Sequence, residues 1–355
     1  MFSLSIRSYR ALSCLAVLAA SPAFAVSQPG DIVVATYGSI DQTTLGGLSR
    51  YNGSGAVVWS SVTQDPTFTY PLFSASGVAF SAQTHTLYAS SFAQDSATGQ
   101  YDILKYSTGG VYQGTLVTGM SVQPSSIHVG PNGDIYFSQY GGGNILEYTP
   151  AGAFVQNVVT GLSSGAGFAW GPNGDLYVND FGAGTVSEYH NGSVIHSYQG
   201  PVGSGIVPEG MVFLPNGGDL LVSAFTTNQI LKFNPNTLAL DGVFATIPTV
   251  PSTGITNYPG GMIIDKSGNV MVAVLGADYN HSGQLMEYST SGTLLNTFET
   301  GLPVSDDLVL IPEPSTGVLA LLAAGMMSLT WRCRAGRCGA RRERRLTRTR
   351  HSSRG

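Results

Sequence analysis

The central part of this chain, residues 26–311, contains no cysteine and very few basic residues. The three cysteines lie near the two ends, so the central part can form neither disulfides nor a thiol-based active site. It holds four Lys and Arg against 19 Asp and Glu, a formal charge of −15. Such a surface cannot neutralise phosphates, which argues against a DNA- or RNA-binding protein.

Convincing helical periodicity is also missing from residues 26–311. Glycine is abundant, with 46 residues, and only 10% of the chain is charged, which is typical of a turn-rich all-β protein. The histidines lack the spacing of a zinc site. No nucleophile elbow, P-loop or dinucleotide fingerprint stands in the context that its chemistry requires, so we expect neither a catalytic residue nor a metal ligand of these types.

Residues 1–25 have the pattern of a secretory signal peptide. Arg7 and Arg10 precede an apolar run at 11–20, and Ala23-Phe24-Ala25 supplies the two small residues, Ala23 and Ala25, of a cleavage site. We expect cleavage after Ala25. The alternative of a lipoprotein is disfavoured because Cys14 lies inside the apolar run.

The C-terminal segment, residues 312–345, combines three features in a fixed order. Pro312-Glu313-Pro314 is followed by an uncharged stretch at 316–331 and then by an arginine-rich tail, which residues 346–355 extend. The stretch is at the short end for a transmembrane helix. The arginines would remain on the cytoplasmic side and leave residues 26–311 outside the membrane.

This order resembles the PEP-CTERM sorting signal of Gram-negative bacteria. The resemblance implies that an exosortase recognises Pro312, Glu313 and Pro314, and processes a protein anchored in the inner membrane. The protein would then reach the cell surface or the extracellular matrix. The alternative is a simple C-terminal membrane anchor that is retained.

Three strand-like pieces each recur six times along residues 26–311, at spacings of about 41 to 55 residues. The first piece includes Ile127-His128-Val129, the second includes Ile135-Tyr136-Phe137, and the third ends in an aromatic residue such as Tyr148. A fourth strand follows each aromatic residue. Four short strands per unit are the pattern of a β-propeller blade.

The ends of this region determine the number of blades. Residues 31–35 form a second-type strand without a first strand, and residues 307–310 form a first-type strand without a second. If the two pair, they complete a sixth blade and close the ring. The sequence therefore predicts an all-β fold, a six-bladed β-propeller.

The units at 126–154 and 167–195 resemble NHL repeats, since Pro131-Asn132-Gly133-Asp134-Ile135-Tyr136-Phe137 keeps the core pattern of such a repeat. Similarity extends to propellers of the SMP-30/gluconolactonase type. That resemblance implies a divalent cation held near the starts of the first strands. The matching positions are Ser76, Gly165 or Ala166, Glu209 and Gly260, and three of them lack a suitable ligand, so we expect no metal-dependent cofactor chemistry.

The long connections of a propeller open on one face, and here they contain aromatic residues. We therefore expect a binding face with Tyr70, Tyr258 and Tyr279, and with Glu209 and Asp306 at the mouth of the channel. We interpret Glu209, Asp306 and Asp307 as solvated carboxylates, with a weak site for a cation such as calcium as the alternative. A row of aromatic residues after the second strands, which includes Tyr140, Phe181 and Phe225, is expected to pack between blades.

These observations favour a non-catalytic binding or scaffold module that takes a polysaccharide or protein ligand. One alternative is a hydrolase or lyase of the gluconolactonase-like type with a degenerate metal site. Perturbed carboxylates and histidines clustered at one channel mouth would support it. Another is a structural matrix protein without a specific ligand. The fold alone does not choose among them.

Overall fold

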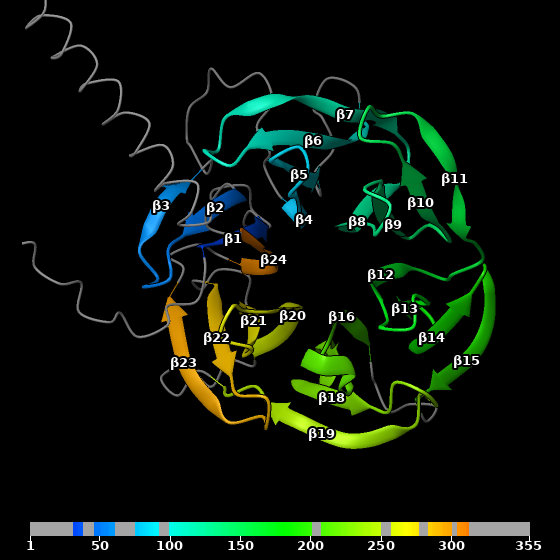
Figure 1. The fold of residues 1–355 in the computed structure, drawn as a ribbon, viewed down its shortest axis with the longest axis vertical. Coiled ribbons are helices and arrows are strands. Elements are labelled where there is room, and N and C mark those ends of the chain that lie inside the picture. The colour runs from blue at the N-terminus through cyan, green and yellow to red at the C-terminus, as the bar shows by residue number, and fades with distance from the viewer. Residues whose placement is uncertain are drawn as a thin grey trace, which may run out of the picture.

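The computed structural model describes residues 31–37, 46–60, 75–91, 99–200, 207–249, 257–276, 283–299 and 304–311. They form six antiparallel sheets of four strands each, arranged as a ring around a central axis (Figure 1). The predicted all-β, six-bladed propeller is therefore confirmed. The predicted signal peptide, the segment at 316–331, Tyr70 and Tyr279 lie outside the described residues.

The strands of each blade follow one another from the central channel to the rim. The blade that contains both ends consists of β24 (Val304–Ile311), β1 (Asp31–Tyr37), β2 (Gly47–Tyr51) and β3 (Val57–Ser60). The next two blades consist of β4 (Ala75–Ser81), β5 (Thr86–Ser91), β6 (Tyr101–Ser107) and β7 (Tyr112–Met120), and of β8 (Gln123–Val129), β9 (Ile135–Tyr140), β10 (Ile145–Tyr148) and β11 (Phe154–Val159). The last three consist of β12 (Gly165–Trp170), β13 (Leu176–Asp180), β14 (Thr185–His190) and β15 (Ser193–Gln199); of β16 (Pro208–Phe213), β17 (Leu220–Ala224), β18 (Gln229–Phe233) and β19 (Leu240–Thr246); and of β20 (Asn257–Ile264), β21 (Val270–Gly276), β22 (Gln284–Tyr288) and β23 (Leu294–Glu299).

The two ends of the propeller close the ring as the sequence predicts. β24 pairs with β1, with Asp31 opposite Ile311 and Ala35 opposite Asp307. This pairing joins the first and last parts of the propeller in one blade. Side chains of both strands enter the core, and Leu308 is only 2% exposed. No sheet edge then remains open at the seam between the chain ends.

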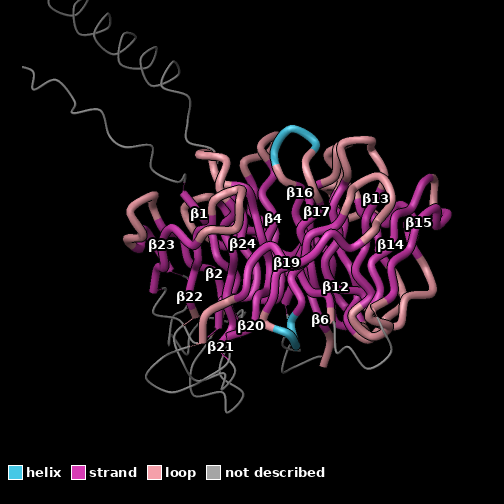
Figure 2. The backbone as a smooth tube through the Cα atoms, turned by 90° about the horizontal axis from the view of Figure 1, so that it is seen from below, coloured by secondary structure: helices cyan, strands magenta, loops and turns pink. Residues whose placement is uncertain are grey.

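Two short 3₁₀ helices mark the two faces of the propeller, which are seen from the side in Figure 2. η1 (Pro215–Gly217) connects a first strand to a second strand, and η2 (Phe225–Thr227) connects a second strand to a third. We call the side of η1 the hairpin face. The opposite side, where first strands begin and second strands end, is the loop face.

A repeated network fixes the turns of the hairpin face. In one blade Asn132 and Tyr136 donate hydrogen bonds to the Glu147 carboxylate, at 2.9 and 2.6 Å. Asn173 and Tyr177 do the same to Glu188 in the next blade. The Asn-Gly-Asp segments are therefore hairpin turns, as expected. Both carboxylates are buried, and each accepts hydrogen bonds from three side chains.

Candidate functional site

A β-bulge interrupts the first strand of every blade near its start. The register shifts between Pro208 and Met211 in β16, and the other five first-to-second strand pairs shift at the equivalent place. Bulges re-aim side chains, and they are frequent at the rims of closed sheets and beside functional sites. Here the bulged positions face the central channel and include Glu209 and Asp306.

The second strand of one blade holds the bulge of the next blade in place. The Ser90 hydroxyl donates to the Ser125 carbonyl at 2.6 Å, and the Ser138 hydroxyl donates to the Ala166 carbonyl at 2.6 Å. Asn179, which is fully buried, donates to the backbone carbonyl of Glu209 at 3.1 Å. Three of the six bulges, those of β8, β12 and β16, are thus held by hydrogen bonds from the preceding blade.

Glycines at the bulges allow the first strands to approach closely. A Cβ atom on Gly167 would lie 2.2 Å from the Glu209 carbonyl oxygen, and one on Gly261 would lie 2.3 Å from Asp307 Oδ1. A side chain at either position would force the neighbouring backbone or side chain to move. The narrow channel that results brings residues from six separate first strands around one point.

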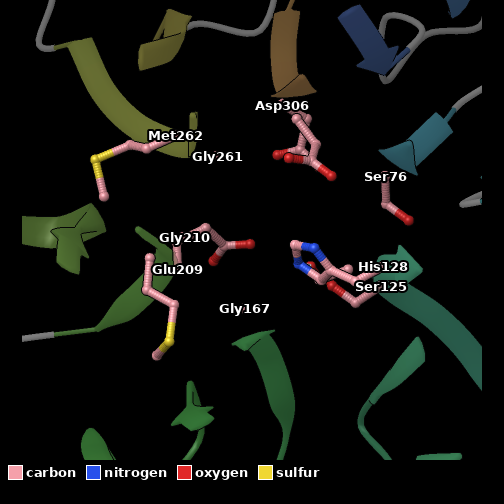
Figure 3. Close-up of a pocket in the computed structure, with 12 residues that line it drawn as sticks. Ser76, Ser125, His128, Gly167, Glu209, Gly210, Gly261, Met262 and Asp306 are labelled. Carbon is pink, nitrogen blue, oxygen red and sulfur yellow. The ribbon is translucent and has the colours of Figure 1, made fainter. Parts of the chain in front are cut away.

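That point is a small cavity of about 30 Å³ at the centre of the propeller (Figure 3). Glu209, Asp306 and His128 point toward it from different blades. The other lining residues are Ser76, Ser125, Ser126, Gly167, Gly210, Met211, Gly261, Met262 and Asp307. The cavity is polar at its centre and is large enough for one or two water molecules or a small group of a larger ligand.

Two carboxyl groups in this cavity hold protons more tightly than usual. Burial raises the pKa of Glu209 to about 7, and the neighbouring Asp307 adds to the shift. Burial also raises the pKa of Asp307 to about 7. The backbone N–H groups of Val78 and Leu308 donate hydrogen bonds to the Asp307 carboxylate at 3.1 and 2.9 Å, which makes this rise smaller. Of the three carboxyl groups expected to be solvated, Asp306 is buried, whereas Glu209 and Asp307 are half-buried and stay partly accessible to solvent.

His128 is the functional candidate that the sequence did not single out. Its ring lies edge-on to Phe168 at 4.7 Å, and its Nε2 lies 3.1 Å from the Ser126 hydroxyl. Burial lowers the pKa of His128 to about 4, so the ring is neutral at pH 7. The sequence shows that His128 lies in a first strand. Because first strands line the channel, this position could have identified His128 as a candidate.

The cavity does not fit the metal site that the gluconolactonase resemblance implies. Ser76 donates its hydroxyl to the Pro124 carbonyl at 3.0 Å, and Ala166 and Gly260 offer no side-chain oxygen. Among the residues that the structure describes, no three Asp, Glu, His or Cys side chains are grouped to hold one metal ion. What the cavity offers instead is two carboxyl groups with raised pKa values, whose charges repel, beside a neutral imidazole.

A row of aromatic side chains follows the loop face through four consecutive blades. The ring centroids of Tyr140 and Phe181 lie 5.6 Å apart, and those of Phe181 and Phe225 lie 6.2 Å apart, both pairs edge-on. The rings of Phe225 and Tyr258 are stacked, with their centroids 4.4 Å apart. Tyr140 is 42% exposed and the other three are half-buried. The expected packing between blades is present for Tyr140, Phe181 and Phe225, and none of these side chains is fully buried.

The loop that carries Phe181 is held rigidly. The Asp180 carboxylate accepts hydrogen bonds from the backbone N–H groups of Ser163 and Ser164 at 2.7 and 2.9 Å, and from Ala183 at 3.1 Å. These bonds tie the connection from β11 to β12, which enters this blade, to the turn between β13 and β14. The centre of the aromatic row is therefore presented on a fixed backbone.

Comparison with known proteins supports the C-terminal sorting motif and the propeller fold separately. Residues 310–335 match the PEP-CTERM protein-sorting motif, and no curated protein matches the chain. A protein of unknown function from Bacteroides caccae has a similar structure, with a TM-score of 0.59 and 14% identity over 80% of this chain and 100% of that one. The periplasmic gluconolactonase PpgL of Pseudomonas aeruginosa has a TM-score of 0.53 and 15% identity, over 80% and 99% of the two chains.

A chain from the structure of a nidogen–laminin complex is also similar, with a TM-score of 0.58 and 14% identity over 79% of this chain and 97% of that chain. At such low identity these likenesses establish the fold alone, and the fold serves both an enzyme and a protein of a complex. No helix among the described residues is long and apolar enough to cross a membrane. The chain is thus a six-bladed β-propeller protein, similar in fold to gluconolactonases, with a PEP-CTERM sorting motif near its C-terminus.

Proposed function

We propose that this protein is a surface or matrix component whose propeller is a non-catalytic binding module. The PEP-CTERM motif implies export, membrane anchoring and processing by an exosortase. The signal peptide with cleavage after Ala25, and the membrane helix at 316–331, belong to this proposal. The ligand is a polysaccharide or a protein of the cell surface, bound at the loop face.

The aromatic row from Tyr140 to Tyr258 is the observation that supports binding at this face. Aromatic rings provide large contact areas, and rings that are already packed lose little entropy when a ligand binds. Tyr70 and Tyr279 remain predictions for the same face. Sugar rings or apolar side chains of a partner would lie along the row. At the channel the half-buried Glu209 would be accessible to the ligand, whereas Asp306 is buried and would only line the cavity.

The test is a binding screen of the purified mature chain against soluble polysaccharides of bacterial surfaces, with affinity electrophoresis as the measurement. We expect at least one polysaccharide to retard the chain and Tyr140→Ala to weaken that retardation. Tyr140 is suited to this purpose because its exposed ring contributes little to the core. Retardation by no polysaccharide and by no cell-surface protein would contradict the proposal.

A second candidate function is hydrolysis or elimination in the channel, as in the enzyme alternative. The cavity supports this candidate because Glu209, Asp307 and His128 all have shifted pKa values at one place. A carboxyl group with a pKa near 7 suits a general acid or base. Lactone hydrolysis by the wild type that is abolished in Glu209→Gln would favour the enzyme over the binding module.

A further inference from the structure

Exposed apolar side chains gather at one end of the outermost strands. The described residues include twelve large hydrophobic side chains that are exposed, and all except Tyr140 lie within the first four residues of an outermost strand or directly before it. All six blades contribute. We call these eleven residues the apolar rim: Val57, Val58, Val111, Phe154, Val155, Val194, Ile195, Leu240, Val243, Leu294 and Leu295.

The turns beside the apolar rim are uncharged as well. The six connections between third and fourth strands, at 52–56, 108–111, 149–153, 191–192, 234–239 and 289–293, contain no Asp, Glu, Lys or Arg. Along the six outermost strands only Asp241 and Glu299 carry such a charge, and only Asp241 lies near the rim. In so acidic a protein, this end of the blades is unusual in lacking charge.

The apolar rim lies on the face from which the C-terminal segment leaves the propeller. Each outermost strand starts at its hairpin, on the same side as the turns between first and second strands. β24 is a first strand and ends at Ile311 on this hairpin face, opposite Asp31. Figure 2 shows the turns with η1 on this side and η2 on the other.

The sequence after Ile311 leaves little room between this face and a membrane. Only residues 312–315 separate β24 from the uncharged stretch at 316–331. Four residues span at most about 14 Å when fully extended. A chain held by that stretch therefore keeps its hairpin face within reach of the lipid headgroups, whose layer is several ångströms deep on each side of the bilayer.

We propose that the apolar rim rests on the surface of the lipid bilayer while the C-terminal segment still holds the chain there. This inference rests on the proposed membrane helix at 316–331. The tether keeps the local lipid concentration high, so contacts that are individually weak add to the anchoring. With the hairpin face on the membrane, the loop face and its aromatic row point away, toward ligands.

The charge pattern specifies the kind of lipid surface. The inner turns of the hairpin face contain Asp134, Asp175, Asp219 and Asp265, with Lys266 as their one basic residue. Such a face has no basic cluster with which to attract anionic headgroups. We therefore expect contact with zwitterionic phosphatidylcholine vesicles, and weaker contact when anionic lipid is added at low salt.

The test uses the mature full chain with Cys333 and Cys338 replaced by serine, reconstituted into phosphatidylcholine vesicles. A single cysteine is placed by Val194→Cys at the rim or by Gln199→Cys at the other end of the same strand. Both positions are exposed in β15, and they lie about 17 Å apart. Each is labelled with an environment-sensitive dye and exposed to lipid that carries a nitroxide quencher.

We expect a blue shift and loss of emission by lipid quenching at position 194, and neither at position 199. Flotation with the vesicles but no change at 194 would overturn the rim contact and leave the membrane helix intact. Failure to float would overturn both. A shift at 194 that depends on the protein-to-lipid ratio, without quenching by lipid, would mean that rims of two copies meet and would also overturn the proposal.

Discussion

At the scale of single residues, the channel is controlled by side chains and glycines that the bulges bring together. Glu209 and Asp307 lie in the same cavity, where partial burial raises each pKa to about 7 and the repulsion between their charges adds to the shift of Glu209. Asn179 and the Ser138 hydroxyl hold the neighbouring bulges through backbone carbonyls. Stability and channel electrostatics are therefore linked at these few positions.

Replacing Glu209 by glutamine should make the protein less sensitive to pH. A raised pKa means that the folded protein retains a proton that the unfolded chain loses between about pH 4.3 and pH 7, so the unfolding free energy falls as the pH rises through this window. We expect Glu209→Gln to gain about 1–3 kcal/mol over the wild type at pH 8 and almost nothing at pH 4. Urea denaturation at both pH values measures this. Equal differences at the two values would refute the shift.

Adding one methyl group at Gly167 should destabilise the propeller. The added Cβ would meet the backbone carbonyl of Glu209 at 2.2 Å, and backbone cannot move aside as a flexible side chain can. Thermal unfolding of Gly167→Ala should show a loss of about 1–3 kcal/mol. Gly109→Ala is the matched control, because its nearest atom, Ser107 Oγ, would lie 3.6 Å away. Equal stability of the two variants would show that the blades can separate at the bulge.

At the scale of elements, closure of the ring depends on β24. β24 is the innermost strand of its blade, and its residues Asp306 and Asp307 line the cavity. The same strand therefore seals the fold and contributes to the candidate site. Its end at Ile311 also decides from which face the C-terminal segment leaves.

Truncation tests the closure directly. A chain that ends after residue 311 should unfold cooperatively, since all six sheets are complete. A chain that ends after residue 303 lacks β24, exposes the edge of β1 and leaves the core around Val34 and Leu285 open, so we expect it to lose cooperative unfolding. Circular dichroism against temperature distinguishes the two. Similar melting curves for both chains would contradict the closure.

The sequence predicted the elements well because each blade repeats the same pattern of strands and turns. The pairing of residues 31–35 with 307–310 followed from one missing strand at each end. Sequence also placed Glu209, Asp306 and Asp307 at the channel. It missed the raised pKa values of Glu209 and Asp307, since these depend on how closely Gly167 and its counterparts let the strands approach, and a single sequence does not give that distance.

His128 shows the same limit. It lies in a first strand, but whether its ring faces the channel or the core depends on the bulge between Pro124 and Ile127, which shifts the alternation of side chains. The hydrogen bonds from Ser90, Ser138 and Asn179 to the next blade were also invisible, because they join residues about 28 to 35 positions apart. Long-range contacts of this kind determine the site, whereas local patterns determine the fold.

At the scale of the whole molecule, the two faces of the propeller have different roles in this account. The hairpin face carries the two ends of the propeller, Asp31 and Ile311, and the apolar rim, and the loop face carries the aromatic row. The sorting motif acts outside the propeller. Its residues should therefore affect delivery of the protein without affecting its folding.

Glu313→Ala tests that separation. The variant should keep the unfolding transition of the wild type, because residue 313 follows the last strand, while the protein accumulates in the inner membrane and fails to reach the surface. Cell fractionation with detection of the propeller measures delivery. Normal surface delivery of Glu313→Ala would mean that the tail acts only as an anchor.

The central claim is that the loop face binds the ligand without chemistry in the channel. Its most direct test is calorimetric titration of the wild type, Tyr258→Ala and Glu209→Gln with a polysaccharide that retards the wild type in the binding screen. Tyr258→Ala should lose about 1–3 kcal/mol of binding free energy if it is a hot spot, and Glu209→Gln should bind like the wild type. Thermal unfolding confirms that both variants are folded. Unchanged affinity in Tyr258→Ala, together with loss of binding or turnover in Glu209→Gln, would contradict the account and assign the function to the channel.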